Sequence, residues 1–421
     1  MTKIHTNIPS KVDNEVIFSL YNLFVEADEY VANKARNDCF KYTHTNINMV
    51  SQIPRPDMFS SRFFPKHIIE YIDETALHKI QYVCKIKDRT INIYFVLNDD
   101  MYETLKTSNI HFLDNYIRMM YMWIYVLSAF SKETCSKTLS VYVYFTPFKK
   151  ELPDNQLTTL DAEHVNTAYT THCRLNNEIV LYREEEWFKV FVHETFHSFG
   201  LDFANMPNTG TVNKQLKQLF NVKTDFLLFE SYCEFWARTI NCIMYTYLQL
   251  ENKSNTNYNK FEKTFKKNMD RECLHSMYQG LKILNFMGLD YKTVNKQPNK
   301  PNDKNADAIT TCNYLYKENT AVFSYYIITS LLMNNYNDFM NWCLHNNHND
   351  NNFLEFKKTP GNVDAYIEFI DLSRRDKDVL KMVTKLEKSF LKTDHSGHSC
   401  DGIVDRSLRM TTLDMNNAIG L

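Results

Sequence analysis

The sequence predicts an α+β fold, in which a small mixed sheet packs on helices and a mainly helical region follows. The chain has 421 residues, of which 44% are hydrophobic, so it is long enough to bury a large core. It contains only 8 glycines but 26 tyrosines and 29 phenylalanines. Few glycines argue against a glycine-rich phosphate-binding fold and against a turn-dense all-β protein. Alternating apolar residues in the first half and helical spacing in the second favour the α+β class.

The first half of the chain holds the predicted strands. Apolar positions at helical spacing predict an opening helix over residues 14–37. Between 79 and 97, polar and apolar residues alternate around Lys87-Asp88-Arg89, which is typical of a β-hairpin. The other elements predicted here are a helix over 110–130 and strands over 139–145, near 165–171 and over 178–182.

The second half is predicted to be mainly helical. A polar stretch with two prolines at 295–307 predicts an exposed loop among the helices. The residues from 393 onward are polar, and we expect a flexible tail there. The helices are predicted over 226–250, 258–287, 320–345 and 365–391.

Charge and cysteine usage narrow the classes of function. The net charge of -2 favours neither nucleic acid nor an anionic membrane as a partner. Ten cysteines occur singly, without a C-x-x-C pair, which indicates reduced thiols and a cytoplasmic location. No secretory signal is evident, and the most apolar stretch, 116–130, is too short to span a bilayer. Frequent Asn, Lys, Ile, Tyr and Phe are typical of an A/T-rich genome, such as that of a large DNA virus or of some protists. For a viral protein, the host cytoplasm or the virion is the expected location.

The segment from Glu184 to Gly200 combines an apolar helix with polar residues. Three glutamates at its start suit the positive end of a helix, and Gly200 suits a C-terminal stop. The residues between them leave almost no polar face, so the helix is predicted to be buried nearly all round. Yet it carries His193, Glu194 and His197. Because buried polar groups need partners, a divalent cation is the simplest partner for all three.

The spacing of these three residues suits metal chemistry. Positions i and i+4 lie one above the other on a helix, so His193 and His197 can direct imidazole nitrogens at one ion. Glu194 lies one step round the helix, where it can accept a proton from a metal-bound water without binding the metal. The alternative is a metal-free helical interaction protein, in which backbone carbonyls satisfy two core histidines.

A second predicted buried helix supplies the third ligand. The segment 226–238 carries Glu230 and Glu234 four residues apart between aromatic residues. We assign Glu230 to the metal and Glu234 to the second N–H of a ligand histidine, whose tautomer it fixes. The reverse assignment, with Glu234 as the ligand, stays open. Two histidines, one glutamate and a water form a tetrahedral catalytic zinc site.

This constellation resembles the gluzincin group of zinc metallopeptidases, which have H-E-x-x-H on one helix and a glutamate ligand on a later helix. The pair Glu230 and Glu234 beside aromatic residues resembles the lethal-factor type more than thermolysin, which has aspartate at the second place. The longer metzincin pattern is absent, since position 203 is Phe. The resemblance covers about residues 160–245. It implies a zincin-like core, a zinc-bound water, Glu194 as general base, and an edge strand for an extended substrate, for which 178–182 is in the right place.

The resemblance also implies an oxyanion stabiliser, commonly a tyrosine or a histidine, which the sequence does not single out. Tyr325 and Tyr326, in an apolar run, are the main candidates, and Tyr169 and Tyr182 are further ones. Each could instead pack in the core with its hydroxyl satisfied.

The predicted function is zinc-dependent hydrolysis of a protein or peptide substrate, with Glu194 as the general base. The alternative is a catalytically inactive zincin-like binding or virion protein with structural zinc. The predicted regions are an N-terminal α+β region (1–135), a zincin-like catalytic region (136–292), a helical C-terminal region (308–392) and the flexible tail (393–421).

Overall fold

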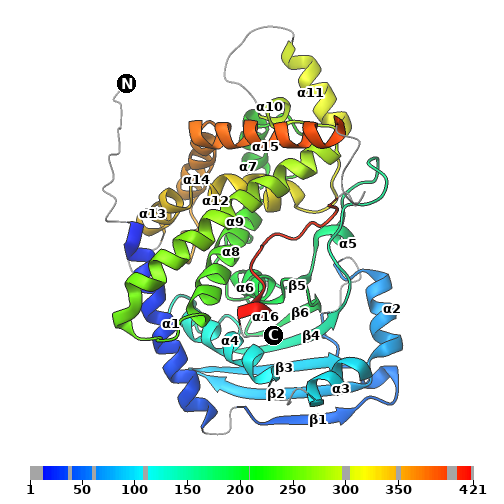
Figure 1. Cartoon of the computed structure of the whole chain (residues 1–421), viewed down its shortest axis with the longest axis vertical. Helices are drawn as coiled ribbons and strands as arrows, with labels where there is room; N and C mark the ends of the chain where they lie inside the picture. The colour runs from blue at the N-terminus through cyan, green and yellow to red at the C-terminus, as the bar shows by residue number, and fades with distance from the viewer. Residues whose placement is uncertain are drawn as a thin grey trace.

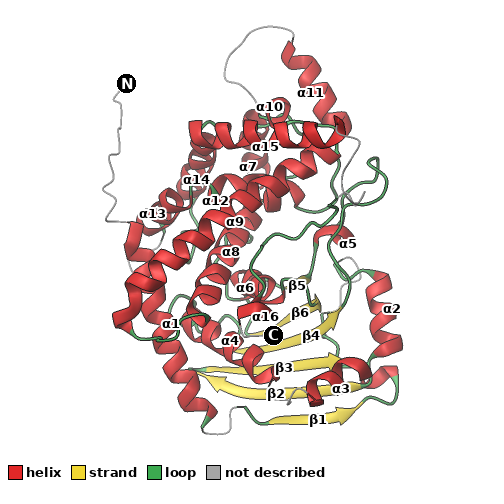
Figure 2. Ribbon diagram, in the orientation of Figure 1, coloured by secondary structure: helices red, strands yellow, loops and turns green. Residues whose placement is uncertain are grey.

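The computed structural model describes residues 13–36, 40–58, 63–107, 112–207, 209–295, 304–347, 352–395 and 405–418. It contains a six-stranded mixed sheet in the N-terminal half, followed by a mainly helical region (Figures 1 and 2). The α+β class is therefore confirmed. The strands are β1 (Tyr42–Asn46), β2 (His78–Ile86), β3 (Arg89–Leu97), β4 (Thr138–Thr146), β5 (Ala168–Thr170) and β6 (Asn176–Arg183).

The sheet has the strand order β1-β2-β3-β4-β6-β5. The predicted hairpin is formed by β2 and β3, which pair antiparallel, and Lys87 adopts a left-handed conformation in its two-residue turn. The strand β4 lies between β3 and β6 and is parallel to both. The strand β5 pairs antiparallel with β6. The expectation that 178–182 forms an edge strand is wrong, since this segment lies within β6. Along the chain β5 precedes β6, and β6 then lies between β4 and β5, so β5 is the edge strand.

Successive residues of the strands point to opposite faces of the sheet and belong to two separate apolar clusters, one on each face. The larger cluster joins the sheet to α1 (Asp13–Ala35), α4 (Phe112–Leu127) and α6 (Trp187–Ser198). The smaller cluster lies against α2 (Lys66–Thr75), which covers the other face. The helix α6 is thus held between the sheet and the helical region, where almost all of its side chains are buried.

The helical region differs in detail from the prediction. The segment 320–345 is not one helix, because Asn335 leaves helical geometry with a φ of -124°. The segment 365–391 is also divided, since the Asp376 carboxylate caps a new helix by accepting the N–H groups of Asp378 and Val379. Residues 296–303 of the predicted loop lie outside the described residues. The remaining elements are η1 (Val50–Gln52), α3 (Asp99–Thr107), α5 (Ala162–Val165), α7 (Thr209–Leu219), α8 (Leu228–Leu248), η2 (Asn255–Asn257), α9 (Tyr258–Phe286), α10 (Tyr291–Val294), α11 (Lys304–Leu315), the π-helical turn η3 (Phe323–Ile328), α12 (Thr329–Met333), α13 (Tyr336–Asn346), α14 (Pro360–Ser373), α15 (Lys377–His395) and α16 (Met415–Ala418).

Residues 405–418, which we call the C-terminal segment, are packed into the molecule. In Figure 1 this segment (red) runs between α9 and α5 towards the sheet and ends in α16. Leu408 and Met410 are buried, and the segment pairs with residues 150–152 through backbone hydrogen bonds. The expected flexible tail is therefore wrong for this segment, because its few apolar residues all enter the core.

Cysteine pairing also differs from the prediction of ten reduced thiols. Cys135 forms a disulfide with Cys173, 38 residues away in the sequence, and Cys84 is disulfide-bonded too. Cysteine spacing therefore does not indicate a reducing compartment for this chain. The free cysteines among the described residues are Cys233, Cys242, Cys273, Cys312 and Cys343.

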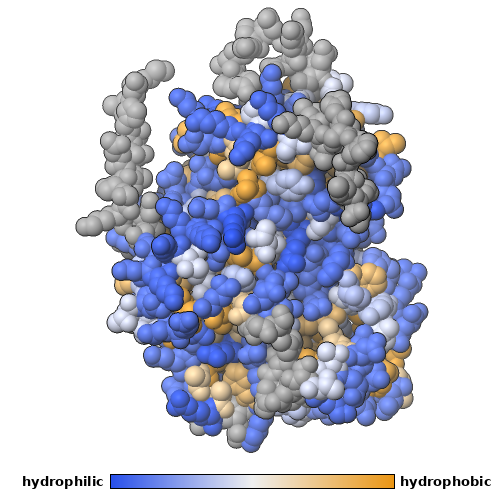
Figure 3. All heavy atoms as spheres, in the orientation of Figure 1, coloured by the Kyte–Doolittle hydropathy of each residue, from blue (hydrophilic) through white to orange (hydrophobic). Residues whose placement is uncertain are grey.

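In the described ranges, no helix is both long enough and apolar enough to cross a bilayer. The face of the molecule in Figure 3 is mainly hydrophilic, with hydrophobic residues in separate patches. This distribution agrees with apolar side chains that are directed mostly into the two clusters on the sheet.

Candidate metal centre

The helix α6 ends in a Schellman motif that bends the chain back over its last turn. The N–H of Gly200 donates to the carbonyl of His197 (3.0 Å), and the N–H of Leu201 donates to that of Phe196 (2.9 Å). Gly200 has a φ of +70°, which a residue with a side chain rarely adopts. The predicted glycine stop is confirmed. The bend returns Asp202 to the side of His197.

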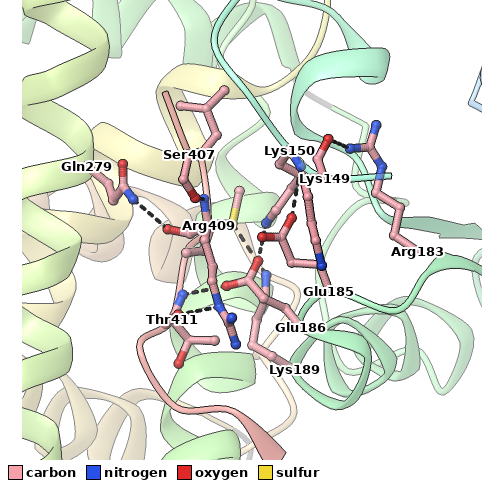
Figure 4. Close-up of polar contacts among 12 residues, drawn as sticks. Lys149, Lys150, Arg183, Glu185, Glu186, Lys189, Gln279, Ser407, Arg409 and Thr411 are labelled. Carbon is pink, nitrogen blue, oxygen red and sulfur yellow. Dashed lines mark hydrogen bonds and ion pairs between the residues drawn. The ribbon is translucent and has the colours of Figure 1, made fainter. Parts of the chain in front are cut away.

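Glu185 and Glu186, before α6, are buried and bind distant segments instead of capping the helix with their side chains. The helix begins at Trp187, after Glu186 in a left-handed conformation, and no side chain caps it. Figure 4 shows Glu185 and Glu186 turned towards Lys150. Glu186 pairs with the Lys150 ammonium and accepts the N–H of Thr411, while Glu185 accepts the N–H of Lys150 at 2.8 Å. Their charges thus fix the start of α6 to two distant segments.

Three predicted ligand atoms converge between α6 and α8. The Nε2 atoms of His193 and His197 are 3.2 Å apart. Each lies close to Oε2 of Glu230, at 3.1 Å from His193 and 3.3 Å from His197. Zinc–nitrogen bonds of 2.0–2.1 Å at tetrahedral angles place neighbouring donors about 3.3 Å apart. The spacing of the three atoms therefore fits one small tetrahedral cation, and the group could hold a metal ion.

Outer carboxylates fix the direction of both imidazoles. Nδ1 of His193 lies 3.1 Å from Glu234, and Nδ1 of His197 donates to Asp202. A neutral imidazole has one N–H, which points to the carboxylate and leaves a lone pair on Nε2. Both Nε2 lone pairs then face each other and the Glu230 oxygen. Such a group of lone pairs is stable only around protons or a cation.

The surroundings shift the pKa values of these donors. Burial lowers the pKa of His193, but hydrogen bonds to Glu230 and Glu234 outweigh it and raise the pKa overall. Burial also lowers the pKa of His197, and neighbouring acidic groups raise it well above its ordinary value. Burial raises the pKa of Glu230, but the imidazoles lower it to about 2. A binding cation must displace protons from the imidazoles, so its affinity falls as the pH falls.

The charge around the donors also favours a dication. With neutral imidazoles, the carboxylates of the centre exceed its cations by two charges. Two imidazolium ions could offset them, but their Nε2 atoms would lie 3.2 Å apart with like charge. One divalent cation balances the centre without that repulsion. The charges counted are the carboxylates of Glu194, Asp202, Glu230 and Glu234 and the cations Lys189 and Arg238.

Glu194 lines a cavity of about 30 Å³ next to the donors, together with His193, Glu234 and Tyr325. Ala168 of the edge strand β5 forms another part of its wall. Burial raises the pKa of Glu194, and the imidazoles offset this only in part. A carboxylate with a raised pKa holds a proton at a higher pH, which suits a group that accepts and returns protons.

The tyrosine candidates separate clearly. Tyr325, on the π-helical turn η3, has its ring 5.8 Å from that of His193, and burial together with the nearby carboxylates of Glu230 and Glu194 raises the pKa of its hydroxyl well above the ordinary value. Its neighbour Tyr326 points elsewhere, and its hydroxyl donates to the carbonyl of Leu408 (2.7 Å). Tyr169 and Tyr182 belong to the cluster on the opposite face of the sheet, against α2. Of the four candidates, only Tyr325 reaches the donors, and Tyr326, Tyr169 and Tyr182 do not.

Lys189 and Asp202 belong to the centre and are not predicted from the sequence. Lys189 places its ammonium 3.0 Å from Glu234, one helical turn before His193, and this spacing on α6 could have indicated it. Asp202 reaches His197 only through the bend at Gly200, which spacing alone does not reveal.

The thiol of Cys233 also lies beside the residues that orient the donors, 3.8 Å from Nδ1 of His197 and 3.7 Å from Asp202. These three residues form a second group with metal-ligand atoms. Nδ1 of His197 donates its N–H to Asp202, so this nitrogen has no lone pair to offer a metal in the second group. We regard this group as support for His197 and not as a second metal site.

Comparison with known proteins found no relative of this chain. No protein-family model matches the sequence, and the searches of curated proteins and of solved structures found no match. The chemistry of the centre must therefore be judged from its own residues.

Proposed function

We propose that this chain is a zinc-dependent peptidase, with His193, His197 and Glu230 as the metal ligands. The observation that supports it best is the convergence of three donor atoms, 3.1–3.3 Å apart, whose lone pairs are oriented by outer carboxylates. Two imidazoles and one carboxylate, with a position left for water, are a donor set typical of catalytic zinc. Zinc bound there would polarise a substrate carbonyl and acidify a water molecule.

The side chains around the donors suit peptide hydrolysis. Glu194 accepts a proton from the attacking water and returns it to the nitrogen of the leaving amine. The hydroxyl of Tyr325 donates a hydrogen bond to the oxygen on which negative charge develops. In the described part of the chain, β5 has a strand neighbour on one side only, and Ala168 of β5 lines the cavity of Glu194. An extended peptide can add to that edge through backbone hydrogen bonds.

The test compares the wild type with Glu194→Gln on a broad peptide library, with cleavage followed by mass spectrometry and zinc measured in both proteins. Removing the general base should lower the cleavage rate by about 100- to 10,000-fold while zinc is retained. The exposed Glu368→Gln variant is the matched control and should cleave like the wild type.

Two results would contradict the proposal. Equal cleavage by the wild type and Glu194→Gln would exclude Glu194 as the base. Zinc-loaded protein without any cleavage would favour the alternative of an inactive binding protein, in which zinc has a structural role.

A further inference from the structure

The disulfide between Cys135 and Cys173 packs against the bend that follows α6. It joins the loop between α4 and β4 to the loop between β5 and β6. A Cβ atom added to Gly200 would lie 3.1 Å from Cβ of Cys173 and 3.2 Å from Sγ of Cys135. The N–H of Cys173 donates to the carbonyl of His197 (3.1 Å). The disulfide therefore contacts the turn that returns the chain from α6 to Asp202.

His172, next to Cys173 in the sequence, connects the disulfide with the metal donors. Its Nδ1 atom lies 3.2 Å from Oδ1 of Asp202, whose side chain is fully buried. Oδ1 also accepts the backbone N–H of Ala204 at 3.3 Å. Oδ2 of the same carboxylate accepts the N–H of the proposed ligand His197. The carboxylate that orients His197 is therefore held in part by an imidazole beside the disulfide.

The disulfide can be reached from solvent on the side of Cys173. Cys135 is buried, whereas Cys173 is only partly buried. Exposed disulfides are reduced more readily than buried ones, because a thiolate must reach one of the two sulfurs. Reduction removes the covalent tie between the two loops. His172 then gains conformational freedom, and its contact with Asp202 is populated less of the time.

We propose that the disulfide between Cys135 and Cys173 sets how tightly the centre holds zinc, through His172 and Asp202. The inference rests on the proposed peptidase function and deepens it by naming a regulation of the same metal site. In the oxidised protein, His172 helps to hold the Asp202 carboxylate against His197. In the reduced protein this support weakens, the imidazole of His197 is less well oriented, and the affinity for zinc falls.

The redox step is an exchange with a dithiol. One thiolate of the dithiol attacks Sγ of Cys173 and releases Cys135 as a thiolate, which forms a mixed disulfide. The second thiol of the reagent then attacks its own bound sulfur and releases Cys173. The reagent leaves as a cyclic disulfide, and its two electrons and two protons end on the two protein thiols.

The first test measures the affinity for zinc by competition with a chelator of known strength. Cys135→Ser and Cys173→Ser together should lower the affinity by about three- to tenfold, less than the loss of a carboxylate that contacts a ligand histidine directly. Dithiothreitol should cause the same decrease in the wild type, and it is removed before the titration because thiols bind zinc. The same treatment should not change the serine variant, which excludes an effect of the disulfide at Cys84.

The second test follows the route through Asp202. His172→Ala should lower the affinity for zinc by about three- to tenfold, and His67→Ala, at an exposed position on α2, is the matched control and should leave it unchanged. In the Asp202→Asn protein, the two serine substitutions should lower the affinity by less than about twofold, because residues that act through one group are not additive. A disulfide that only stabilises the fold would weaken zinc binding equally in both backgrounds.

The outcomes separate this inference from the proposed function. If the oxidised wild type, the reduced wild type and the serine variant bind zinc equally, the disulfide does not regulate the centre, while the metal centre stands. An equal effect of the serine substitutions with and without Asp202 would also overturn the inference. So would an unchanged affinity of His172→Ala, whether or not the serine variant folds. If no form of the protein binds zinc, the proposed function fails, and this inference fails with it.

Discussion

At the scale of single residues, the centre consists of three inner donors and the side chains that orient them. The sequence predicts His193, His197 and Glu230 because i,i+4 spacing on apolar helices leaves few other partners for them. It also predicts that Glu234 contacts a ligand histidine, and its carboxylate does lie at Nδ1 of His193. Asp202 could not be predicted in this way, because its contact depends on the three-dimensional path of the chain after Gly200.

Replacing Asp202 by asparagine should lower the affinity for zinc by about 10- to 100-fold, because the imidazole of His197 loses its orienting carboxylate. The affinity is measured by competition with a chelator of known strength. Asp88→Asn, at the exposed turn between β2 and β3, is the control and should bind zinc like the wild type. An unchanged affinity for Asp202→Asn would show that this carboxylate does not support the metal centre.

At the scale of elements, hydrophobic periodicity predicts much of the architecture, and contacts between distant elements account for what it misses. The hairpin of β2 and β3 is predictable because strict alternation and a short turn are local properties. The place of β5 at the sheet edge is not, since strand order depends on pairing across the whole chain. The turn η3 is also unforeseen, because almost all of its residues are buried and a continuous apolar run does not reveal the helical period. Tyr325 and Tyr326 are adjacent in sequence, but Tyr325 lies beside His193 and Tyr326 binds the carbonyl of Leu408.

The carboxyl group of Glu318 binds the start of η3, and its ionisation should make the folded protein less stable as the pH rises. Its carboxylate accepts the N–H of Phe323 (2.7 Å) and the hydroxyl of Tyr316 (2.8 Å). Burial raises the pKa of Glu318 to about 7, although these hydrogen bonds lower it in part. Between its ordinary pKa and about pH 7, the folded protein keeps a proton that the unfolded chain has lost, so stability decreases through this range.

The prediction is tested with thermal unfolding of the wild type and Glu318→Gln from pH 5 to pH 8. The neutral glutamine cannot ionise, so Glu318→Gln should gain stability relative to the wild type as the pH rises. The exposed Glu368→Gln variant should show no such gain. A constant difference between Glu318→Gln and the wild type would mean that Glu318 does not titrate in this range.

At the scale of the whole molecule, the C-terminal segment joins the sheet region to the helical region. Figure 4 shows Arg409 and Thr411 of this segment beside the charged residues at the start of α6. The carbonyl of Leu408 accepts the hydroxyl of Tyr326, and Sδ of Met410 lies 3.3 Å from the ammonium of Lys189. Composition predicts a loose tail because the segment is short and mostly polar. Its polar groups are instead satisfied by distant buried partners, which no local pattern reveals.

Leu408 should therefore contribute as much to stability as a residue of the central core. It is fully buried, and Leu408→Ala should lower the free energy of unfolding by about 2–5 kcal/mol. Leu372→Ala, at a position 60% exposed on α14, is the matched control and should change it by less than about 0.5 kcal/mol. Urea denaturation measures both values. Equal, small effects would mean that the segment does not pack against the core in solution.

The most direct measurement of the central claim is the zinc content of the purified protein, determined by elemental mass spectrometry after purification without chelators. The wild type and Glu194→Gln should each contain one zinc ion per chain, because Glu194 is not a ligand. His193→Ala should lose the metal, since it removes one of the three converging donors. Wild-type protein without zinc, or His193→Ala with its zinc undiminished, would contradict the proposed metal centre.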